Sequence, residues 1–228
     1  MRHVPVEGIV TTDAELDHTL GIALLREGRR LQLYATRAVI EVLTEDSRVL
    51  PVTAAFAQVT VIELKLGAPE ALHYADGSPA GLSVTPFAVP GDPPRFARQE
   101  SPGHTIGLLV EDTETGGRMA FVPGCGGLDE RMLARLAGAD LLLFDGTFWT
   151  DDEMVRLGLS ERTARQMDHL PIAGRDGSLT LLATLPCRQK VYTHINNSNP
   201  MLIEDSVERR AVEAAGMVVG DDGMRFSL

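Results

Sequence analysis

Cysteine is scarce in this chain: Cys125 and Cys187 are the only two among 228 residues. A disulfide framework needs several cysteine pairs, so that class of secreted domain is excluded and a reducing compartment is expected. No apolar run approaches the roughly 20 residues that a transmembrane helix needs. The start, MRHVPVEGIV, has no apolar signal-peptide segment. We therefore expect a cytoplasmic protein without a membrane partner.

Positive charge is also in short supply. The chain has 21 Lys and Arg against 32 Asp and Glu, which gives a formal net charge of -11. Nucleic-acid binding depends on clustered Lys and Arg, so we expect no nucleic-acid partner. The composition, 44% hydrophobic and 23% charged, is that of an ordinary globular protein. We predict one domain over residues 1–228.

Hydrophobic periodicity predicts an α/β protein, because short apolar strands alternate with amphipathic helices. Strands are expected at 6–12, 31–36, 59–66, 81–90, 104–112, 118–124, 140–147 and 190–197. Helices are expected at 19–27, 37–46, 129–139, 150–167, 178–186 and 206–216. A hairpin is predicted over 217–228.

Residues that can bind a metal gather at the ends of these strands. The acidic run DAELDH (13–18) follows the first strand, His104 begins another, and Asp145 and His194 end two more. In α/β sheets, ligands bind at strand ends, where loops converge. We therefore expect these side chains to meet at one site.

The run DAELDH holds three carboxylates and an imidazole within six positions. Neighbouring carboxylates repel one another, and a divalent cation offsets that repulsion. A helix N-terminus is the alternative explanation for Asp13 and Glu15, but it does not explain His18, because a cation is disfavoured there. We predict a metal site formed by Asp17, His18 and His194.

Several other candidates stay open between two interpretations. His194 is either a metal ligand or a satisfied core histidine. Asn196 and Asn197, the candidate cofactor-binding residues, either orient ligands or bind polar groups of the substrate, or they cap the next turn. Asp145 ends a buried strand, so it needs a cation or several hydrogen bonds, or it caps the following helix. His169 is a general acid or base, or an exposed loop histidine.

The lone histidine at His104 carries little weight by itself, and Cys125 is a thiolate ligand or a plain small residue. The candidate catalytic residues are Asp13 and His169. The candidate metal ligands are Glu15, Asp17, His18, His104, Asp145 and His194.

These motifs resemble the metallo-β-lactamase superfamily, whose signature is T-H-x-H-x-D-H after a strand. TDAELDH (12–18) aligns with that signature: Asp13 and Glu15 stand at histidine positions, and Asp17 and His18 match. SPGHT (101–105) resembles the later P-G-H-T motif. FVPGC (121–125) falls where the superfamily's S-G-D motif supplies a bridging ligand, which would place Cys125 there.

A narrower resemblance is to the pyrroloquinoline quinone (PQQ) biosynthesis B family. It is carried by TDAELDHTLGIALLREG (12–28), LLLFDGTFWTDDEM (141–154), the MDHLP motif and THINNSNPMLIEDSVERRAVEAAG (193–216). The resemblance implies an αββα sandwich lacking its first strands, since the family carries an N-terminal region with a cysteine-rich zinc loop before the acidic motif.

The resemblance also implies a function: iron- and oxygen-dependent hydroxylation of the tyrosine ring in a Glu–Tyr-derived PQQ precursor, which is a small-molecule or peptide-derived partner. The ligands of the Fe²⁺ would be Glu15, Asp17, His18 and His194. Zn²⁺ is the alternative metal, and a homo-oligomer is left open.

Two alternatives accompany the hydroxylase. A zinc-dependent hydrolase of the superfamily is favoured by His104, which the B family usually lacks, and by Cys125. The missing histidines at 13 and 15 favour the hydroxylase, although Glu15 replaces the family's Asp. A non-catalytic carrier or transport factor for PQQ or its precursor is the third interpretation.

Overall fold

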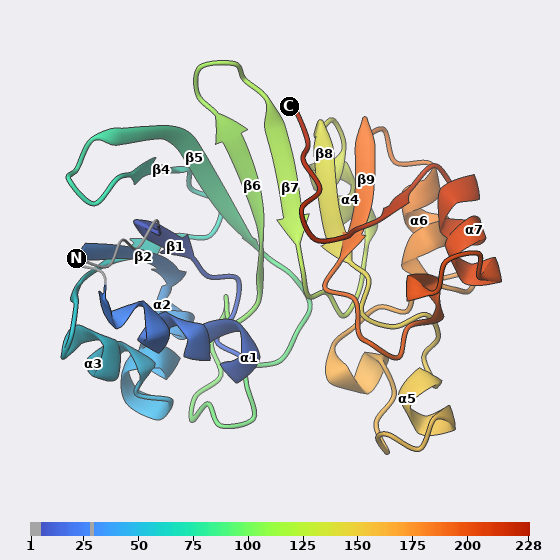
Figure 1. Cartoon of the computed structure of the whole chain (residues 1–228), viewed down its shortest axis with the longest axis horizontal. Helices are drawn as coiled ribbons and strands as arrows, with labels where there is room; N and C mark the ends of the chain where they lie inside the picture. The colour runs from blue at the N-terminus through green and yellow to red at the C-terminus, as the bar shows by residue number, and fades with distance from the viewer. Residues whose placement is uncertain (1–5, 28–29) are drawn as a thin grey trace. The chain divides into compact units, whose positions relative to one another are not determined.

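The computed structural model describes residues 6–27 and 30–228, which form two compact units (Figure 1). Unit 1 comprises Met1–Ala88 and Asp92–Thr115, and unit 2 comprises Val89–Gly91 and Gly116–Leu228. Each unit combines strands and helices, as the periodicity predicts. The single domain over 1–228 stays a prediction.

Unit 1 contains a parallel sheet in the order β1-β2-β3. Its strands are β1 (Gly8–Val10), β2 (Arg30–Thr36) and β3 (Gln58–Leu64). In register, Ile9 faces Leu33 and Leu33 faces Val61. Because the strands are parallel, their carboxyl ends lie at one edge of the sheet, and the acidic run follows β1 there.

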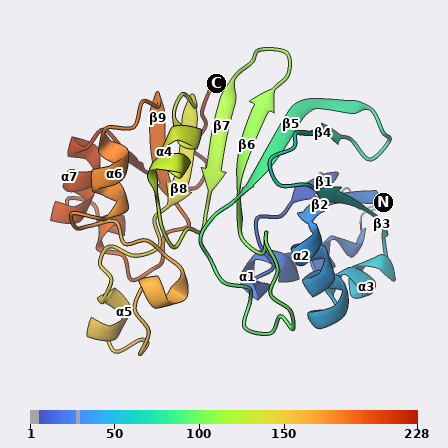
Figure 2. The same cartoon turned by 180° about the vertical axis from the view of Figure 1, so that it is seen from behind.

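Helices cover one face of this sheet (Figure 2). They are α1 (Leu16–Thr19), η1 (Leu20–Glu27), α2 (Arg37–Glu41), η2 (Val42–Asp46) and α3 (Val49–Ala54). Leu33, Val39 and Leu43 are fully buried in the core between sheet and helices. The Thr36 side chain accepts a hydrogen bond from the Val39 amide and so begins α2.

The predicted helix over 37–46 is present, but its second half is a π-helix. The Ser47 amide donates to the Val42 carbonyl at 2.9 Å, five residues back along the chain, whereas an α-helix joins residues four apart. Helix α3 was not predicted, because Pro51 interrupts its pattern. Proline is tolerated there since it lies in the first turn, where its missing N–H costs no hydrogen bond.

The remaining strands of unit 1 are antiparallel. They are β4 (Glu70–His73), β5 (Pro79–Ala88) and β6 (Ile106–Asp112). The segment between β5 and β6 has no helix or strand, as its prolines and glycines predict. The Ile106 amide donates to the Thr12 carbonyl at 2.8 Å, so the start of β6 lies beside the acidic run.

Unit 2 contains a parallel sheet in the order β7-β8-β9-β10. Its strands are β7 (Arg118–Val122), β8 (Leu141–Asp145), β9 (Gln189–Thr193) and β10 (Val218–Val219). The apolar run of β8 is almost entirely buried, as expected for a parallel strand covered on both faces. The carboxyl ends of β7, β8 and β9 meet at one edge.

Helical segments connect these strands. They are α4 (Glu130–Leu136), α5 (Glu153–Arg156), η3 (Arg165–Met167), α6 (Ser178–Ala183), η4 (Pro200–Leu202) and α7 (Val207–Ala214). Side chains of Asp129 and Ser206 cap α4 and α7. Lys190 donates to the Leu182 and Ala183 carbonyls and so closes the carboxyl end of α6. Helix α5 lies beyond the carboxyl ends of the strands (Figure 1).

Two predictions for unit 2 are wrong. The region 150–167 holds only the short α5 and η3, since Gly158, at φ +68°, ends α5. The hairpin over 217–228 does not form, because β10 pairs in parallel with β9 and residues 220–228 contain no strand. Val218 and Val219 of β10 form their strand pairing with β9, so they do not need a second strand after Gly220.

Among the residues that the structure describes, no helix combines the length and the apolar character that crossing a bilayer demands.

Candidate metal centre

Three predicted site residues of unit 2 form one cluster: Asp145, His169 and His194. Each offers one potential ligand atom, and these atoms lie within 4.8 Å of one another. Asp145 ends β8, His194 follows β9, and His169 follows η3. The parallel sheet brings the first two together because neighbouring strands end at the same edge.

The Asp145 carboxylate is fully buried and accepts four hydrogen bonds. Its Oδ2 accepts from the Cys125 amide at 3.0 Å and from His169 Nδ1 at 2.7 Å. Its Oδ1 accepts from the Thr147 amide at 3.0 Å and hydroxyl at 2.6 Å. Four bonds use the acceptor capacity of a carboxylate. Asp145 is therefore suited to orienting other groups, and its role as a metal ligand stays a prediction.

His169 donates its Nδ1–H to this buried carboxylate, which fixes the tautomer. The lone pair of the neutral ring then lies on Nε2. The same arrangement, a metal-binding histidine held by a carboxylate through its other nitrogen, orients ligands in many metal sites. The Leu170 amide donates to the Cys125 carbonyl at 2.7 Å and holds the His169 loop against the loop after β7.

Thr147 orients His194 in the same way. Its hydroxyl oxygen lies 2.7 Å from His194 Nδ1 and 2.9 Å from the His194 carbonyl oxygen. A hydroxyl has one proton, and we assign that proton to the hydrogen bond that Thr147 donates to Asp145 Oδ1. The hydroxyl oxygen of Thr147 then accepts the Nδ1–H of His194. His194 Nε2 then carries the lone pair. The rings of His169 and His194 stack, with centroids 5.4 Å apart.

His194 has a left-handed backbone, with φ +54°. That conformation is strained for a residue with a side chain and persists only where the surroundings enforce it. The Gly146 amide donates to the Thr193 carbonyl, and the Asn199 side chain donates to the Gly146 carbonyl. These bonds tie the loop after β9 to the loop after β8.

Gly146 is required at this crossing. A Cβ placed there would lie 2.9 Å from Tyr192 Cβ and 3.1 Å from the Thr193 carbonyl oxygen, closer than side chains tolerate. The motif DGT therefore has a physical reason for each residue: Asp145 orients His169, Gly146 permits the close approach, and Thr147 orients His194.

Asn196 and Asn197, the candidate cofactor- and substrate-binding residues, lie on this loop. The Asn196 side chain donates to Ser198 Oγ at 2.5 Å, and Ser198 donates to Glu153 at 2.5 Å. Glu153 is buried and also accepts from the Trp149 amide. Asn197 is exposed. Substrate binding by both asparagines stays a prediction.

Cys125 contributes its amide to the cluster, while its thiol donates to the Gly127 carbonyl at 2.9 Å. Burial raises the pKa of the Cys125 thiol to about 12, and the nearby carboxylate of Asp145 acts in the same direction. A protonated thiol is a poor metal ligand. The plain interpretation of Cys125 as a small buried residue fits this geometry.

In unit 1, the acidic run forms a second histidine–carboxylate pair. His18 Nδ1 lies 2.7 Å from Asp13 Oδ1, which also accepts from the Glu15 amide at 3.0 Å. The Thr12 hydroxyl donates to Asp13 Oδ2 at 3.1 Å. Asp13 is buried, so it holds His18 as Asp145 holds His169. Its proposed catalytic role stays a prediction, as does the sharing of one ion by His18 and His194.

The two members of this pair shift each other's pKa. Burial alone raises the pKa of Asp13, but the hydrogen bond and charge of His18 outweigh it and leave the value below 3.8. The hydrogen bond to Asp13 raises the pKa of His18 above 6.5, against the lowering effect of burial. Burial and the carboxylates of Asp13 and Asp17 raise the pKa of Glu15.

The remaining candidates lie as follows. Glu15 is the N-cap of α1, and Asp17 is an exposed residue whose carboxylate lies 3.9 Å from His18 Nε2. His104 is buried in unit 1, where its Nε2 contacts the Gln99 carbonyl at 3.0 Å. Sequence reasoning missed Thr147 and Glu153. A threonine two residues after a strand-ending aspartate was the available signal for the first.

We expect Thr147→Val to lower the affinity of the unit 2 cluster for Zn²⁺ by roughly tenfold, the scale of lost orienting hydrogen bonds around metal ligands. Valine has the shape of threonine but does not accept the Nδ1–H of His194. Competition with a fluorescent chelator measures the affinity. Thr150→Val, which removes a hydroxyl bonded to the exposed Asp152, is the matched control. Equal affinities in the two variants would contradict the orienting role.

A pH dependence follows from the Asp13–His18 pair. The lowered pKa of Asp13 contributes stability that is fully present above pH 3.8, and this contribution is lost as the pH falls through the lowered pKa. The raised pKa of His18 contributes stability that is fully present below pH 6.5, and this contribution is lost as the pH rises through the raised pKa. In metal-free protein, we expect the coupling free energy of the pair to be largest between these values, at about 1–3 kcal/mol.

Urea unfolding of wild type, Asp13→Asn, His18→Gln and the double variant at several pH values measures that coupling. It should decline above the raised pKa of His18. A coupling that is the same at pH 5 and pH 9 would contradict the assignment.

Comparison with known proteins identifies the class that this fold and site define. The family model of the beta-lactamase superfamily domain matches residues 1–195. The β-lactamase fold that the sequence motifs predict is thus confirmed, and the metal-capable cluster at the strand ends suits that superfamily.

Relatives narrow the assignment. The chain is 42% identical over 237 residues to "Coenzyme PQQ synthesis protein B" of Gluconacetobacter diazotrophicus, and 42% identical over 234 residues to that of Methylobacterium nodulans. Each alignment covers 100% of this chain and 75% of the relative. The crystal structure of Zn(2+)-bound PqqB from Methylobacterium extorquens matches with a TM-score of 0.85 at 39% identity, with the same coverages. The chain belongs to the coenzyme PQQ synthesis protein B family.

Proposed function

We propose that this protein acts in PQQ assembly as a metal-dependent hydroxylase of the tyrosine ring in a Glu–Tyr-derived precursor. Its relatives are named for PQQ synthesis, which supports the pathway. The single observation that carries metal dependence is the stacked pair of His169 and His194, each oriented through Nδ1.

The donor set suits a transition-metal ion. Imidazole nitrogens bind iron and zinc, and two oriented imidazoles with carboxylates nearby are a common basis for both. In this proposal, His169 and His194 of unit 2 bind the metal. Glu15, Asp17 and His18 of unit 1 stay the further ligands that the family resemblance predicts. An iron ion, when bound, supplies the activation of O₂ that ring hydroxylation needs.

The protein's own groups have separate tasks in this scheme. Asp145 and Thr147 hold the two imidazoles in one tautomer before any ion arrives, which lowers the entropic cost of binding. Asn196, held by Ser198, presents an amide at the same loop and is suited to hydrogen-bonding polar groups of the precursor. The buried Glu153 keeps that loop in place through Ser198.

Zinc-dependent hydrolysis is the second candidate. It is favoured by one observation: the similar PqqB of Methylobacterium extorquens is described as Zn(2+)-bound. Zinc has no redox chemistry, so a zinc enzyme would activate water for attack on an ester, amide or phosphodiester.

The test compares the protein loaded anaerobically with Fe²⁺ and the protein loaded with Zn²⁺, each given the Glu–Tyr-derived precursor and O₂. The hydroxylase predicts oxygen consumption and product that gains oxygen atoms from ¹⁸O₂, with iron only. A hydrolase predicts label from H₂¹⁸O with zinc. Precursor that binds but is unchanged under both conditions would overturn the enzymatic proposal and favour a carrier. His169→Ala is the inactive variant, and His73→Ala is the matched control.

A further inference from the structure

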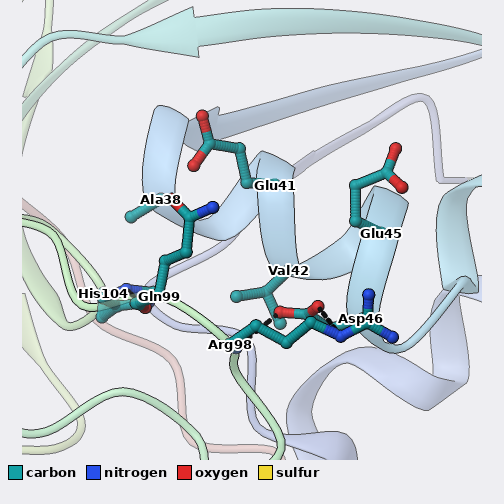
Figure 3. A pocket seen from close by; sticks show the side chains of 8 residues that line it. All are labelled: Ala38, Glu41, Val42, Glu45, Asp46, Arg98, Gln99 and His104. Atoms are coloured by element: carbon teal, nitrogen blue, oxygen red, sulfur yellow. Dashed lines mark hydrogen bonds and ion pairs between the residues drawn. The ribbon is translucent and has the colours of Figure 1, made fainter.

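A ligand site owes its specificity to a few polar groups, and these groups need hydrogen-bonding capacity that the fold leaves unused. Carboxylates that line the cavity beside α2 in unit 1 are already paired (Figure 3). Asp46 lies 3.3 Å from the Arg98 guanidinium and accepts from the Arg98 amide, and Glu41 pairs with Arg37 at 3.0 Å. The side chain of Asn196 in unit 2 differs, because one of its two polar ends is unused.

Glu153 begins a chain of hydrogen bonds that ends at Asn196. The Glu153 side chain is buried, and its Oε2 accepts from the Trp149 amide at 2.6 Å. Its Oε1 accepts from the Ser198 hydroxyl at 2.5 Å, and Ser198 Oγ in turn accepts from Asn196 Nδ2 at 2.5 Å. This chain connects the start of α5 to the loop after β9, two residues beyond the candidate ligand His194.

The carboxylate of Glu153 determines the direction of each bond in this chain. An ionised carboxylate only accepts hydrogen bonds, and a distance of 2.5 Å is typical of a hydroxyl that donates to one. The single hydroxyl proton of Ser198 therefore points at Glu153. The oxygen of Ser198 is then an acceptor for Asn196, so the amide nitrogen of Asn196 faces Ser198 and the amide oxygen faces away.

The amide oxygen of Asn196 is the end that is left for a ligand. The two N–H groups of Nδ2 face Ser198 Oγ at 2.5 Å and Met154 Sδ at 3.6 Å. Within residues 6–27 and 30–228, no group donates a hydrogen bond to Asn196 Oδ1. This oxygen is accessible to solvent, since the buried side-chain atoms without a partner in those residues do not include it.

We propose that Asn196 recognises a hydrogen-bond donor of the precursor and that Glu153, acting through Ser198, determines this preference. The inference rests on the proposed function for the identity of the precursor, and it adds which of its groups Asn196 binds. On the tyrosine ring, the donor is the phenolic hydroxyl. A carboxylate only accepts, so it would meet the Asn196 oxygen as a second acceptor and be disfavoured. Glu153 is thus a positioning residue for the group that contacts substrate.

Backbone hydrogen bonds also hold the Asn196 loop, independently of Glu153. The Asn196 amide donates to the Thr147 carbonyl at 3.2 Å, and the Asn196 carbonyl accepts from the Asn199 amide at 2.9 Å. A change at residue 153 should therefore turn the Asn196 side chain without displacing His194.

The Glu153→Gln variant should reverse the direction of the chain. The Trp149 amide still needs an acceptor, so the new amide oxygen takes that place and the new NH₂ group donates to Ser198. The Ser198 hydroxyl then donates to Asn196, whose side chain turns to give its oxygen to Ser198 and its nitrogen to the ligand. Glutamine has the shape of glutamate and every bond of the chain keeps a partner, so the variant should fold.

Amide-proton spectra of the full chain, recorded without precursor or O₂, test the orientation by itself. In wild type, we expect nuclear Overhauser contacts between the Nδ2 protons of Asn196 and the methyl group of Met154. Glu153→Gln should lose these contacts. Glu161→Gln, which removes an exposed carboxylate of the same segment, is the matched control and should keep them. Because this measurement involves no turnover, its failure is distinguishable from failure of the proposed hydroxylase.

Two uncharged probes, 4-hydroxyphenylacetamide and 4-methoxyphenylacetamide, test the preference for a donor. Chemical-shift titration of the Zn²⁺-loaded full chain should show that wild type binds the hydroxy probe about tenfold more tightly, the scale of one hydrogen bond. In Glu153→Gln the preference should disappear, because the turned Asn196 amide donates to the oxygen of either probe. Asn196→Ala should abolish the preference too, and adding Glu153→Gln to it should change nothing further.

Three results would overturn the assignment. The first is an Asn196 amide that has no contact with Met154 in wild type, or keeps that contact in Glu153→Gln. The second is equal binding of the two probes by wild type, or binding of neither. The third is the same preference in wild type and in Glu153→Gln, which would assign the preference to another group, such as a metal ion that binds the phenolate.

Discussion

The His194→Ala variant is expected to retain no metal after dialysis, whereas wild type retains it. His194 is one of two imidazoles in the unit 2 cluster, and Thr147 holds it in the tautomer that presents Nε2. Losing a ligand should cost more than losing an orienting partner, so affinity should fall by at least about 100-fold. Metal content by plasma mass spectrometry after loading with Zn²⁺ or Fe²⁺ is the measurement. His73→Ala, in β4, is the control and should keep the metal.

His18→Ala tests the prediction that residues from the acidic run and from the end of β9 share one ion. If they do, His18→Ala loses the same single equivalent as His194→Ala, and the double variant loses nothing more. Full metal content in His18→Ala would show that the shared-ion prediction is wrong. The cluster of Asp145, His169 and His194 would then stand as a site of its own.

Asp145→Ala is expected to give the largest loss of stability among single substitutions at the site, about 3–5 kcal/mol in the free energy of unfolding. The substitution leaves the amides of Cys125 and Thr147 and the Nδ1–H of His169 without an acceptor in a fully buried place. Each orphaned buried donor costs about 1–3 kcal/mol, and the sum is not fully additive. Urea unfolding of metal-free protein measures the effect without the contribution of bound metal.

Asp222→Ala is the matched control for this substitution. Asp222 is an exposed aspartate of the same unit, so its loss should change stability by no more than about 0.5 kcal/mol. Asp145→Asn should fall between wild type and Asp145→Ala, since its amide oxygen still accepts while its NH₂ faces donors. If Asp145→Ala unfolds at the same urea concentration as Asp222→Ala, the buried carboxylate does not hold the loops together.

The local structure was largely predictable from the sequence where one strong physical pattern dominates. The continuous apolar run of β8 indicates a buried parallel strand, and Ser206 with Gly216 marks the two ends of α7. Short elements were less predictable. Helix α3 contains Pro51 in its first turn, and β10 has only two residues, which pair with β9 instead of forming a hairpin.

The sequence alone also identified Asp145, His169 and His194 as candidates, because metal-capable residues followed apolar strands and matched the motifs of a family. It did not establish that these three form one cluster, since they lie 24 and 25 residues apart along the chain and only the parallel sheet of unit 2 brings them together. It also did not distinguish a ligand from an orienting group. That distinction depends on which nitrogen of each histidine donates, and to what.

What the sequence determined by itself is the family, the strand-and-helix pattern and the residue types available for chemistry, because these follow from local periodicity and motif spacing. Tertiary structure alone decided that the Asp145 carboxylate accepts four hydrogen bonds and that Thr147 orients the His194 ring. It also decided that His104 has a buried ring nitrogen without a hydrogen-bond partner. Hydrogen bonds between distant segments need distances and angles that no one-dimensional pattern specifies.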